Sequence, residues 1–352
     1  MIRIALIPGD GIGPEVLAEA RRALDALSAA GLADVALEEF PHGAEHYLAT
    51  GETLGEAALC RLRDEFDAIL LGAVGDPRVP DNRHARDILL GLRFRLDLYI
   101  NFRPARLRAP RLSPLKSAES RPIDFVIFRE NTEGLYTGSG GLLREGTPDE
   151  VAVSESIATR HGVERIVRAA FEFARREGRT RVTLGDKANA VPHVYGLWRR
   201  VFEQVAAEYD GIEAEMRYVD ALAMQLVREP GRFEVIVAEN LLGDILSDLA
   251  AELVGGMGLA PSANLNPAGG SMYEPVHGSA PDLVGTGTAN PMAALLSTAL
   301  LLRDGGAAEA AASIERAVDE ALAADVCTPD VGGSMGTEEV GRWIAERVVR
   351  AS

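Results

Sequence analysis

Two aspartates four residues apart, Asp244 and Asp248, stand in the segment NLLGDILSDLAAEL, residues 240–253. On a helix this spacing places both carboxylates on one face, with leucines and an isoleucine on the other. Magnesium and manganese ions bind carboxylate oxygens, so the pair is a candidate metal site. An amphipathic helix with a solvated acidic face would show the same spacing, and the segment alone fits both interpretations.

Four arginines follow apolar runs. Three of them, Arg93, Arg95 and Arg103, occur in GLRFRLDLYINFRP, and Arg129 follows the strand-like run IDFVIF. The planar guanidinium suits capture of a carboxylate through two hydrogen bonds. Ordinary solvated or ion-paired arginines would show the same pattern, and the position after apolar runs, where sites of α/β proteins form, adds only modest support for substrate binding.

Tyr136 in RENTEGLYTG and Lys187 in GDKAN are candidates for general acid and base. In EPVHGSAPDL, His277 and the small residues after it could bring backbone N–H groups close to a phosphate, and Asp282 could accept a ribose hydroxyl. Surface positions and an ordinary turn are the alternatives for these residues.

The N-terminal segment IPGDGIGPE only partly fits the G-x-G-x-x-G dinucleotide pattern. Gly9 and Gly11 match, but Pro14 occupies the place of the third glycine. The pattern is therefore a weak match to a dinucleotide-binding loop, and we expect a tight strand-to-helix turn with Pro14 in the first helical turn.

Composition excludes several classes of protein. The chain has 352 residues, enough for about two domains, and its 47% hydrophobic content supports packed cores. A net charge of −17 argues against nucleic-acid or anionic-membrane binding. Two cysteines, Cys60 and Cys327, are too few for a disulfide framework, and no secretory signal is apparent, so we expect a cytoplasmic protein without a membrane span.

Strand-like runs alternate with helical patterns, which predicts an α/β fold with a substantially parallel sheet. We expect strands in IRIALI, FDAILLGAV, IDFVIF, RVTLGD and FEVIVAEN, and helices over 15–30, 161–178 and 291–302, the last of them buried. Residues 139–153 read as an arm or hairpin, and the glycine-rich stretch 261–291 reads as a long functional loop.

These motifs occur in one order along nearly the whole chain: GDGIGPE, GLRFRLDLYINFRP, RENTEGLY, DKAN, YVDALAM, NLLGDILSDL, EPVHGSAPD, TANP and PDVGGSMGT. In this arrangement the sequence resembles the β-decarboxylating dehydrogenases, the family that acts on 3-isopropylmalate, isocitrate, homoisocitrate and tartrate. The resemblance implies two α/β domains that share a large mixed sheet, and not a Rossmann fold. It places the cofactor-binding domain at 1–101 and 256–352, and a substrate, metal and dimerisation domain at 102–255 with its arm near 137–155.

The resemblance also implies roles for individual residues. Tyr136 would donate a proton to the enolate and Lys187 would help to remove the hydroxyl proton. Mg²⁺ or Mn²⁺ would bind Asp220, Asp244 and Asp248, with Lys187 and Asp220 supplied by the second subunit of a homodimer. The remaining residues would bind ligands: the substrate would contact Arg93, Arg103, Arg129, Leu89 and Leu90, and NAD would contact Glu274, His277, Gly278, Ser279, Ala280, Asp282, Asn290, Asn189 and Asp330.

The substrate implied is a 2-hydroxy dicarboxylate. Leu89 and Leu90 favour an apolar branch, as in 3-isopropylmalate, because a further carboxylate facing them would be buried without a partner. The RENTEGLY motif and Arg86 are closer to other members, so D-malate, tartrate and then homoisocitrate remain alternatives. A non-catalytic regulatory subunit is the alternative outside enzymes, and the sequence leaves open whether K⁺ assists.

Overall fold

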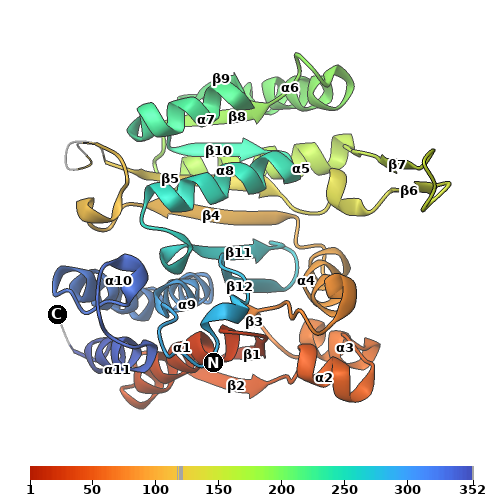
Figure 1. The fold of residues 1–352 in the computed structure, drawn as a ribbon. Helices are drawn as coiled ribbons and strands as arrows, with labels where there is room; N and C mark the ends of the chain where they lie inside the picture. The colour runs from red at the N-terminus through yellow and green to blue at the C-terminus, as the bar shows by residue number, and fades with distance from the viewer. Residues whose placement is uncertain (117, 119–121, 351–352) are drawn as a thin grey trace. The chain divides into compact units, whose positions relative to one another are not determined.

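The computed structural model describes residues 1–116, 118 and 122–350. The chain divides into two compact units (Figure 1). Unit 1 comprises Met1–Leu98, Arg106–Glu119 and Ala251–Ser352, and unit 2 comprises Tyr99–Ala105 and Ser120–Ala250. Both units combine helices with a sheet, which confirms the predicted α/β class.

The elements of unit 1 come from both ends of the chain. Its strands are β1 (Ile2–Gly9), β2 (Val35–Glu39), β3 (Ala68–Ala73), β11 (Pro261–Leu265) and β12 (Ser271–Pro275). Its helices are α1 (Gly13–Ala29), α2 (Ala44–Thr50), α3 (Glu56–Asp64), α4 (Arg83–Arg95), α9 (Met292–Asp304), α10 (Ala308–Ala323) and α11 (Thr337–Arg347). No helix in the described part of the chain is long and apolar enough to cross a membrane.

The strands of unit 1 follow the order β2-β1-β3-β12-β11. Strand β3 is parallel to β1 and to β12, and only the β11–β12 pair is antiparallel. The carboxyl ends of β1, β3 and β12 therefore lie at one edge, where Gly9, Ala73 and Pro275 end their strands. Helix α9 packs against β3, β11 and β12 and is buried over nearly its whole length, as predicted.

The first turn of unit 1 requires glycine. Gly9 and Gly11 have φ values of 71° and 60°, and a Cβ on Gly11 would lie 1.9 Å from the backbone oxygen of Ser279. Pro14 lies in the first turn of α1, where a missing N–H costs nothing. The predicted tight turn is confirmed. The turn alone accounts for Gly9 and Gly11, so the third glycine of a dinucleotide-binding pattern is not needed to explain them.

Unit 2 has its own set of elements. Its strands are β4 (Ile100–Arg106), β5 (Asp124–Glu130), β6 (Gly140–Leu143), β7 (Val151–Ser154), β8 (Arg181–Asp186), β9 (Glu213–Tyr218) and β10 (Val235–Ala238), the last residue of β4 belonging to unit 1. Its helices are α5 (Arg160–Arg176), α6 (Pro192–Ala206), α7 (Val219–Arg228) and α8 (Asn240–Leu253), whose last turn belongs to unit 1.

The main sheet of unit 2 has the order β4-β5-β10-β8-β9. Strand β10 is parallel to β5 and β8, and β8 is parallel to β9. Three expected strands therefore end side by side at one edge, followed by Asn131, Lys187 and Glu239. Helix α5 buries its apolar face against β5, β8 and β10, which is the face that the sequence pattern predicts.

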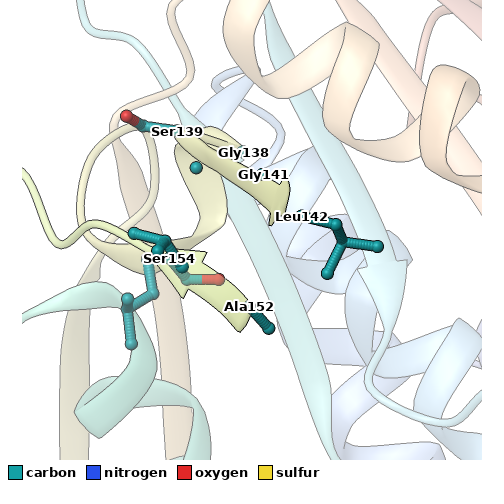
Figure 2. A pocket seen from close by; sticks show the side chains of 9 residues that line it. Gly138, Ser139, Gly141, Leu142, Ala152 and Ser154 are labelled. Carbon is teal, nitrogen blue, oxygen red and sulfur yellow. The ribbon is translucent and has the colours of Figure 1, made fainter. Parts of the chain in front are cut away.

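The predicted arm is a hairpin that projects from unit 2 (Figure 1). Strand β6 pairs with β7 in the antiparallel direction, and all eight residues of the two strands are exposed. A pocket of about 300 Å³ lies along the hairpin, lined by Leu135 and by residues 138–142 and 152–154 (Figure 2). Two leucines of the hairpin, Leu142 and Leu143, are exposed.

The prediction of one long loop over 261–291 is wrong. Strands β11 and β12 occupy its first half as an antiparallel pair. These strands lack the apolar sequence pattern of buried strands, because the polar residues Ser262 and Asn264 occupy fully buried positions. The amide of Asn264 donates to Oε1 of Glu274 at 2.8 Å, so the buried polar groups are compensated across the pair.

Candidate active site

Helix α8 brings several of the predicted residues together in unit 2. Oδ1 of Asp244 accepts a hydrogen bond from Nη1 of Arg129 at 2.5 Å, and Oδ2 accepts one from the Tyr136 hydroxyl at 2.7 Å. The Arg129 guanidinium also lies 5.2 Å from the centre of the Tyr136 ring. One carboxylate therefore orients both a cation and a phenolic proton donor.

Asp248 lies one helical turn further along and faces the second arginine. Nη1 of Arg103 lies 3.4 Å from Oδ1 of Asp248 and 3.2 Å from the hydroxyl of Ser247, while Nε donates to Asn101 at 2.9 Å. Burial raises the pKa of the Asp248 carboxyl above its usual value, the Arg103 charge opposes this, and the Asp244 charge adds to it. The two carboxylates thus share a face of α8, as predicted, between two arginines.

The sheet places these groups. Arg129 lies at the carboxyl end of β5 and pairs in register with Ala238 of β10, which leads into α8. Gly243 lets the helix pass close to Arg129, because a Cβ at this position would lie 2.7 Å from Cγ of the arginine. The glycine of the GDILSD motif therefore permits the contact between Arg129 and Asp244.

Asn240 is a site residue that the sequence analysis missed. Its Oδ1 accepts a hydrogen bond from Nε of Arg129 at 3.0 Å, and its Nδ2 donates to the backbone oxygen of Glu133 at 2.9 Å. The side chain fixes the arginine and the segment that leads to Tyr136 at the same time. Its place at the start of NLLGDILSDL is the signal that could have revealed it.

Glu239, the residue before it, is a buried acid behind the same segment. The Tyr195 hydroxyl donates to Oε2 of Glu239 at 3.3 Å, and burial raises the pKa of both groups. A Cβ on Gly134 would lie 2.1 Å from Oε1 of Glu239, so the glycine allows the chain before Tyr136 to cross the acid.

Lys187 and Asp220 form an ion pair elsewhere in unit 2. Lys187 directly follows β8, Asp220 lies in the first turn of α7, and Nζ is 3.0 Å from Oδ2. The hydrogen bond that Lys187 donates lowers the pKa of the Asp220 carboxyl below its usual value. Asn189, predicted to bind the cofactor, is exposed in the turn that follows Lys187.

The donor set on α8 suits a magnesium or manganese ion, because both groups are carboxylates. Among the described residues of the single chain, however, no three Asp, Glu, His or Cys side chains gather at a point that could hold a metal. Within the described residues, Asp244 and Asp248 are therefore a pair of carboxylates without a third such side chain beside them.

Unit 1 holds Arg93 and, apart from Asn189, the residues predicted to bind the cofactor. Nη2 of the buried Arg93 donates to Oε1 of Glu274 at 2.9 Å. Its Nε is also buried and has no hydrogen-bond partner among the described residues, as expected of a donor that awaits a ligand. Leu89 and Leu90 are half-buried on the same helix, and Leu89 also packs against the core of unit 1.

The described contacts of the loop after β12 involve its backbone and the side chain of His277. Ser279 accepts a hydrogen bond from the backbone N–H of Ile12 at 2.9 Å through its own backbone oxygen, and Ala280 has a φ of 40°. Nδ1 of His277 contacts the oxygen of Gly278, while its buried Nε2 has no partner in the described chain. Burial lowers the pKa of His277, so a neutral imidazole borders this loop, and Asp282 is exposed.

Asn290 and Asp330 are the remaining predicted cofactor residues. Nδ2 of Asn290 donates to Oδ2 of Asp330 at 3.0 Å, and Thr328 donates to the other carboxylate oxygen at 2.6 Å. The structure thus joins two residues forty positions apart in the sequence. The imidazole nitrogen of His277 without a partner among the described residues and this amide–carboxylate pair are polar groups that suit a polar ligand.

Comparison with known proteins gives one consistent family. The sequence matches the isocitrate/isopropylmalate dehydrogenase family over residues 3–344. It is 46% identical over 349 residues to the 3-isopropylmalate dehydrogenase of Thermobifida fusca, with 99% of this chain and 98% of that protein covered. It is 49% identical over 352 residues to the enzyme of the same name from Streptomyces griseus, with the same coverage.

A solved structure agrees with the sequence relatives. The isocitrate dehydrogenase of Methylococcus capsulatus superposes with a TM-score of 0.90 at 38% sequence identity, and the match covers 99% of this chain and 100% of that one. The fold is therefore the one that the resemblance implies.

Proposed function

Since the chain belongs to the isocitrate/isopropylmalate dehydrogenase family, we propose that it oxidises and decarboxylates 3-isopropylmalate to 4-methyl-2-oxopentanoate, a step of leucine biosynthesis, with NAD and Mg²⁺ or Mn²⁺. The observation that carries the proposal is the arrangement on α8, where Asp244 contacts both Arg129 and Tyr136. It combines a carboxylate-binding cation, a metal ligand and a proton donor.

The chain's own residues divide the reaction between them. Arg93, Arg103 and Arg129 bind the carboxylates of the substrate, and Lys187 takes part in removing the proton of the C2 hydroxyl. NAD, when bound, would supply the acceptor for the hydride of C2, and the carboxylate on C3 would leave as CO₂. Tyr136 then protonates C3 of the enolate, which completes the product.

The metal would supply stabilisation of negative charge on the C2 oxygen. Asp244 and Asp248 would hold it, together with Asp220 of a second chain. Binding of the cation would also change the hydrogen bonds seen here, because it competes with Arg129 and Tyr136 for the oxygens of Asp244. The tyrosine proton would then be free to move toward the substrate.

For the cofactor we propose the loop after β12 and the Asn290–Asp330 pair. Glu274, His277, Gly278, Ser279, Ala280 and Asp282 would bind NAD, with Asn189 contributing from the turn after Lys187. An exposed carboxylate at Asp282 suits a free ribose 2′-hydroxyl and repels a 2′-phosphate. This favours NAD over NADP, and in the same proposal unit 1 is the cofactor domain and unit 2 the substrate domain.

We further propose a homodimer formed through unit 2. Its hairpin arm exposes Leu142, Leu143 and Val153, while Met224 of α7 and Ile245 of α8 are 66% and 58% exposed. Apolar side chains this exposed mark a protein interface, and the self-association of two copies would cover them. It would also bring Lys187 and Asp220 of one chain to the α8 carboxylates of the other.

The proposal for the side group of the substrate rests on α4. The half-buried Leu89 and Leu90 support an apolar branch over a third carboxylate, because a charge packed against them would lose hydration. D-malate or tartrate is the next candidate, and a regulatory subunit without turnover is the alternative outside enzymes. The unpaired cysteines Cys60 and Cys327 fit the cytoplasm, where we expect the enzyme to work.

The test is NADH formation from 3-isopropylmalate with Mn²⁺, followed by absorbance, with the ketoacid product identified by mass spectrometry. We expect equal amounts of NADH, CO₂ and 4-methyl-2-oxopentanoate, and loss of all three when EDTA removes the metal. Turnover that continues without a divalent ion would contradict the metal role, and the absence of turnover on every 2-hydroxy dicarboxylate would leave the regulatory-subunit alternative.

A further inference from the structure

Asp10 is a buried carboxylate in the turn between β1 and α1, only 5% exposed. Its Oδ1 accepts a hydrogen bond from the backbone N–H of Ala44, at the start of α2, at 2.5 Å. Its Oδ2 accepts one from the N–H of Gly75 at 2.7 Å and lies 2.8 Å from Nε2 of His84 in α4. One side chain therefore connects three separate segments of unit 1.

The surroundings are shaped to admit this carboxylate. A Cβ on Gly43 would lie 2.7 Å from Oδ1 of Asp10, so only glycine allows the approach. Helix α2 has no capping side chain of its own, and Asp10 supplies the acceptor that its first N–H needs. Gly75, with a φ of 134°, presents its N–H from the loop after β3.

His84 is the partner that links Asp10 to α4. It is the second residue of the helix, is completely buried, and stacks on the ring of Tyr47 from α2 at a centroid distance of 6.0 Å. Nδ1 has no hydrogen-bond partner in the described chain, so Nε2 carries the proton that His84 donates to Asp10.

The chain before α4 does not by itself fix where the helix begins. Asp81 and Asn82 have φ values of 59° and 49°, a left-handed conformation that costs free energy in residues other than glycine. Such a conformation persists only when tertiary contacts hold it. The buried contact between His84 and Asp10, two residues further along, is such a contact.

Both ends of this connection lead to residues of the proposed site. Helix α4 carries Leu89, Leu90 and Arg93 within about three turns of His84. The turn that contains Asp10 continues into Ile12, whose N–H donates to Ser279 in the proposed cofactor loop at 2.9 Å.

We propose that Asp10 and His84 are a positioning pair that holds α4, and with it the substrate-binding side chains, against the turn that supports the cofactor loop. This inference rests on the proposed function for the roles of α4 and the loop. Neither residue of the pair is among the side chains proposed to bind substrate, cofactor or metal. Breaking the pair displaces α4, so it weakens binding of the 2-hydroxy acid more than it slows the chemical steps.

The experiment compares three histidine variants of the full-length protein. His84→Phe keeps a stacking ring but removes the donor, and His84→Gln restores an amide donor near the position of Nε2. His42→Phe is the matched control, because His42 is also a buried histidine of unit 1 that stacks on a neighbouring ring, Phe40. In the described part of the chain, the ring of His42 packs on Phe40 and His46 and makes no hydrogen bond with Asp10.

For His84→Phe we expect KM for the 2-hydroxy acid to rise on the order of tenfold to a hundredfold with kcat within about twofold, as for a small displacement of binding groups. His84→Gln should recover most of this loss, and His42→Phe should leave KM unchanged. Equal KM values in His84→Phe and His42→Phe, or a fall in kcat alone, would overturn the proposal.

Hydrogen–deuterium exchange gives a readout that needs no turnover. We expect peptides that cover α4 to exchange faster in His84→Phe than in wild type. In His84→Gln and His42→Phe, the same peptides should exchange at the wild-type rate. Unchanged α4 exchange in His84→Phe would refute the pair even if no substrate were found, whereas an inactive wild type would refute only the proposed function. If His84→Phe does not fold, His84→Asn, whose shorter amide withdraws from Asp10, takes its place in both measurements.

Discussion

The proposed site residues of the two units differ in how they use charge. In unit 2, Asp244 and Asp248 face Arg129 and Arg103, so the side chains are charged and paired on one helix face. In unit 1, the loop after β12 carries small residues beside His277, whose pKa is lowered by burial and which is therefore neutral at physiological pH. The charged residues of the proposed site there are Arg93 with Glu274, and Asp282 and Asp330.

This difference matches two kinds of task. Paired charges on a rigid helix can stabilise charge that develops during a reaction without reorganising. Backbone N–H groups on a tight loop recognise the shape and polar groups of a large ligand, and they carry no charge that a side-chain substitution could remove. Substitutions in unit 2 should therefore reduce catalysis steeply, whereas those in unit 1 should change binding more gently.

Asp244→Asn should have the largest effect. The substitution removes one of the two carboxylate charges proposed to hold the metal, and it weakens the contacts to Arg129 and Tyr136. We expect kcat/KM to fall about a thousandfold, because metal stabilisation is worth several kcal/mol. Manganese affinity, measured by calorimetry, should fall as well. Glu252→Gln, an exposed acid on the same helix, is the control, and unchanged manganese affinity in Asp244→Asn would remove that residue from the ligand set.

Tyr136→Phe should reduce kcat about a hundredfold, the size of effect typical of a lost general acid. Its KM should change little, because the hydroxyl donates to Asp244 and the ring stays in place beside Arg129. Steady-state kinetics with the 2-hydroxy acid check the split between the two constants. A rise in KM as large as the fall in kcat would show that the tyrosine binds substrate and does not transfer a proton.

Gly11→Ala tests the backbone contact in unit 1. A Cβ here meets the Ser279 oxygen at 1.9 Å, so the cofactor loop must move, and we expect KM for NAD to rise several-fold with kcat little changed. Gly31→Ala is a matched control, because Gly31 also has a positive φ, of 73°, but open space around it. Both variants should lose some stability to backbone strain. If Gly31→Ala raised KM for NAD equally, the contact with Ser279 would not be the cause.

Glu239→Gln should affect stability and its pH dependence. Burial raises the pKa of Glu239, so the folded protein holds this proton more tightly than the unfolded chain does. That stabilisation is present below the unfolded pKa and is lost as pH rises through the folded one. The Tm of the variant relative to wild type should therefore increase from about pH 4 to about pH 8. If the difference in Tm between the variant and wild type stayed constant with pH, ionisation of Glu239 would not destabilise the folded protein.

The sequence allowed the α8 acid pair, Arg129 and the first turn to be predicted because each depends on local spacing. Asp244 and Asp248 share a face through helix geometry alone, and Gly11 and Pro14 specify a turn wherever they occur. The strand before Arg129 was also predictable, since a continuous apolar run indicates a buried strand.

The partners of these residues could not be predicted, because tertiary contacts choose them. Asn240 and Asn101 are ordinary amides in the sequence, and only the pairing of β5 with β10 brings Asn240 to Arg129. Nothing in the sequence around His84 indicates its contact with Asp10, because Asp10 lies 74 positions earlier in the chain. The strands β11 and β12 were missed for the same reason, since their buried Asn264 is compensated by Glu274 across the pair.

The most direct test of the proposed activity is a substrate panel with NAD and Mn²⁺, comparing 3-isopropylmalate, D-malate, tartrate, isocitrate and homoisocitrate by kcat/KM. The half-buried Leu89 and Leu90 predict the highest value for 3-isopropylmalate. A highest value for homoisocitrate or isocitrate would contradict the assignment of an apolar branch to α4.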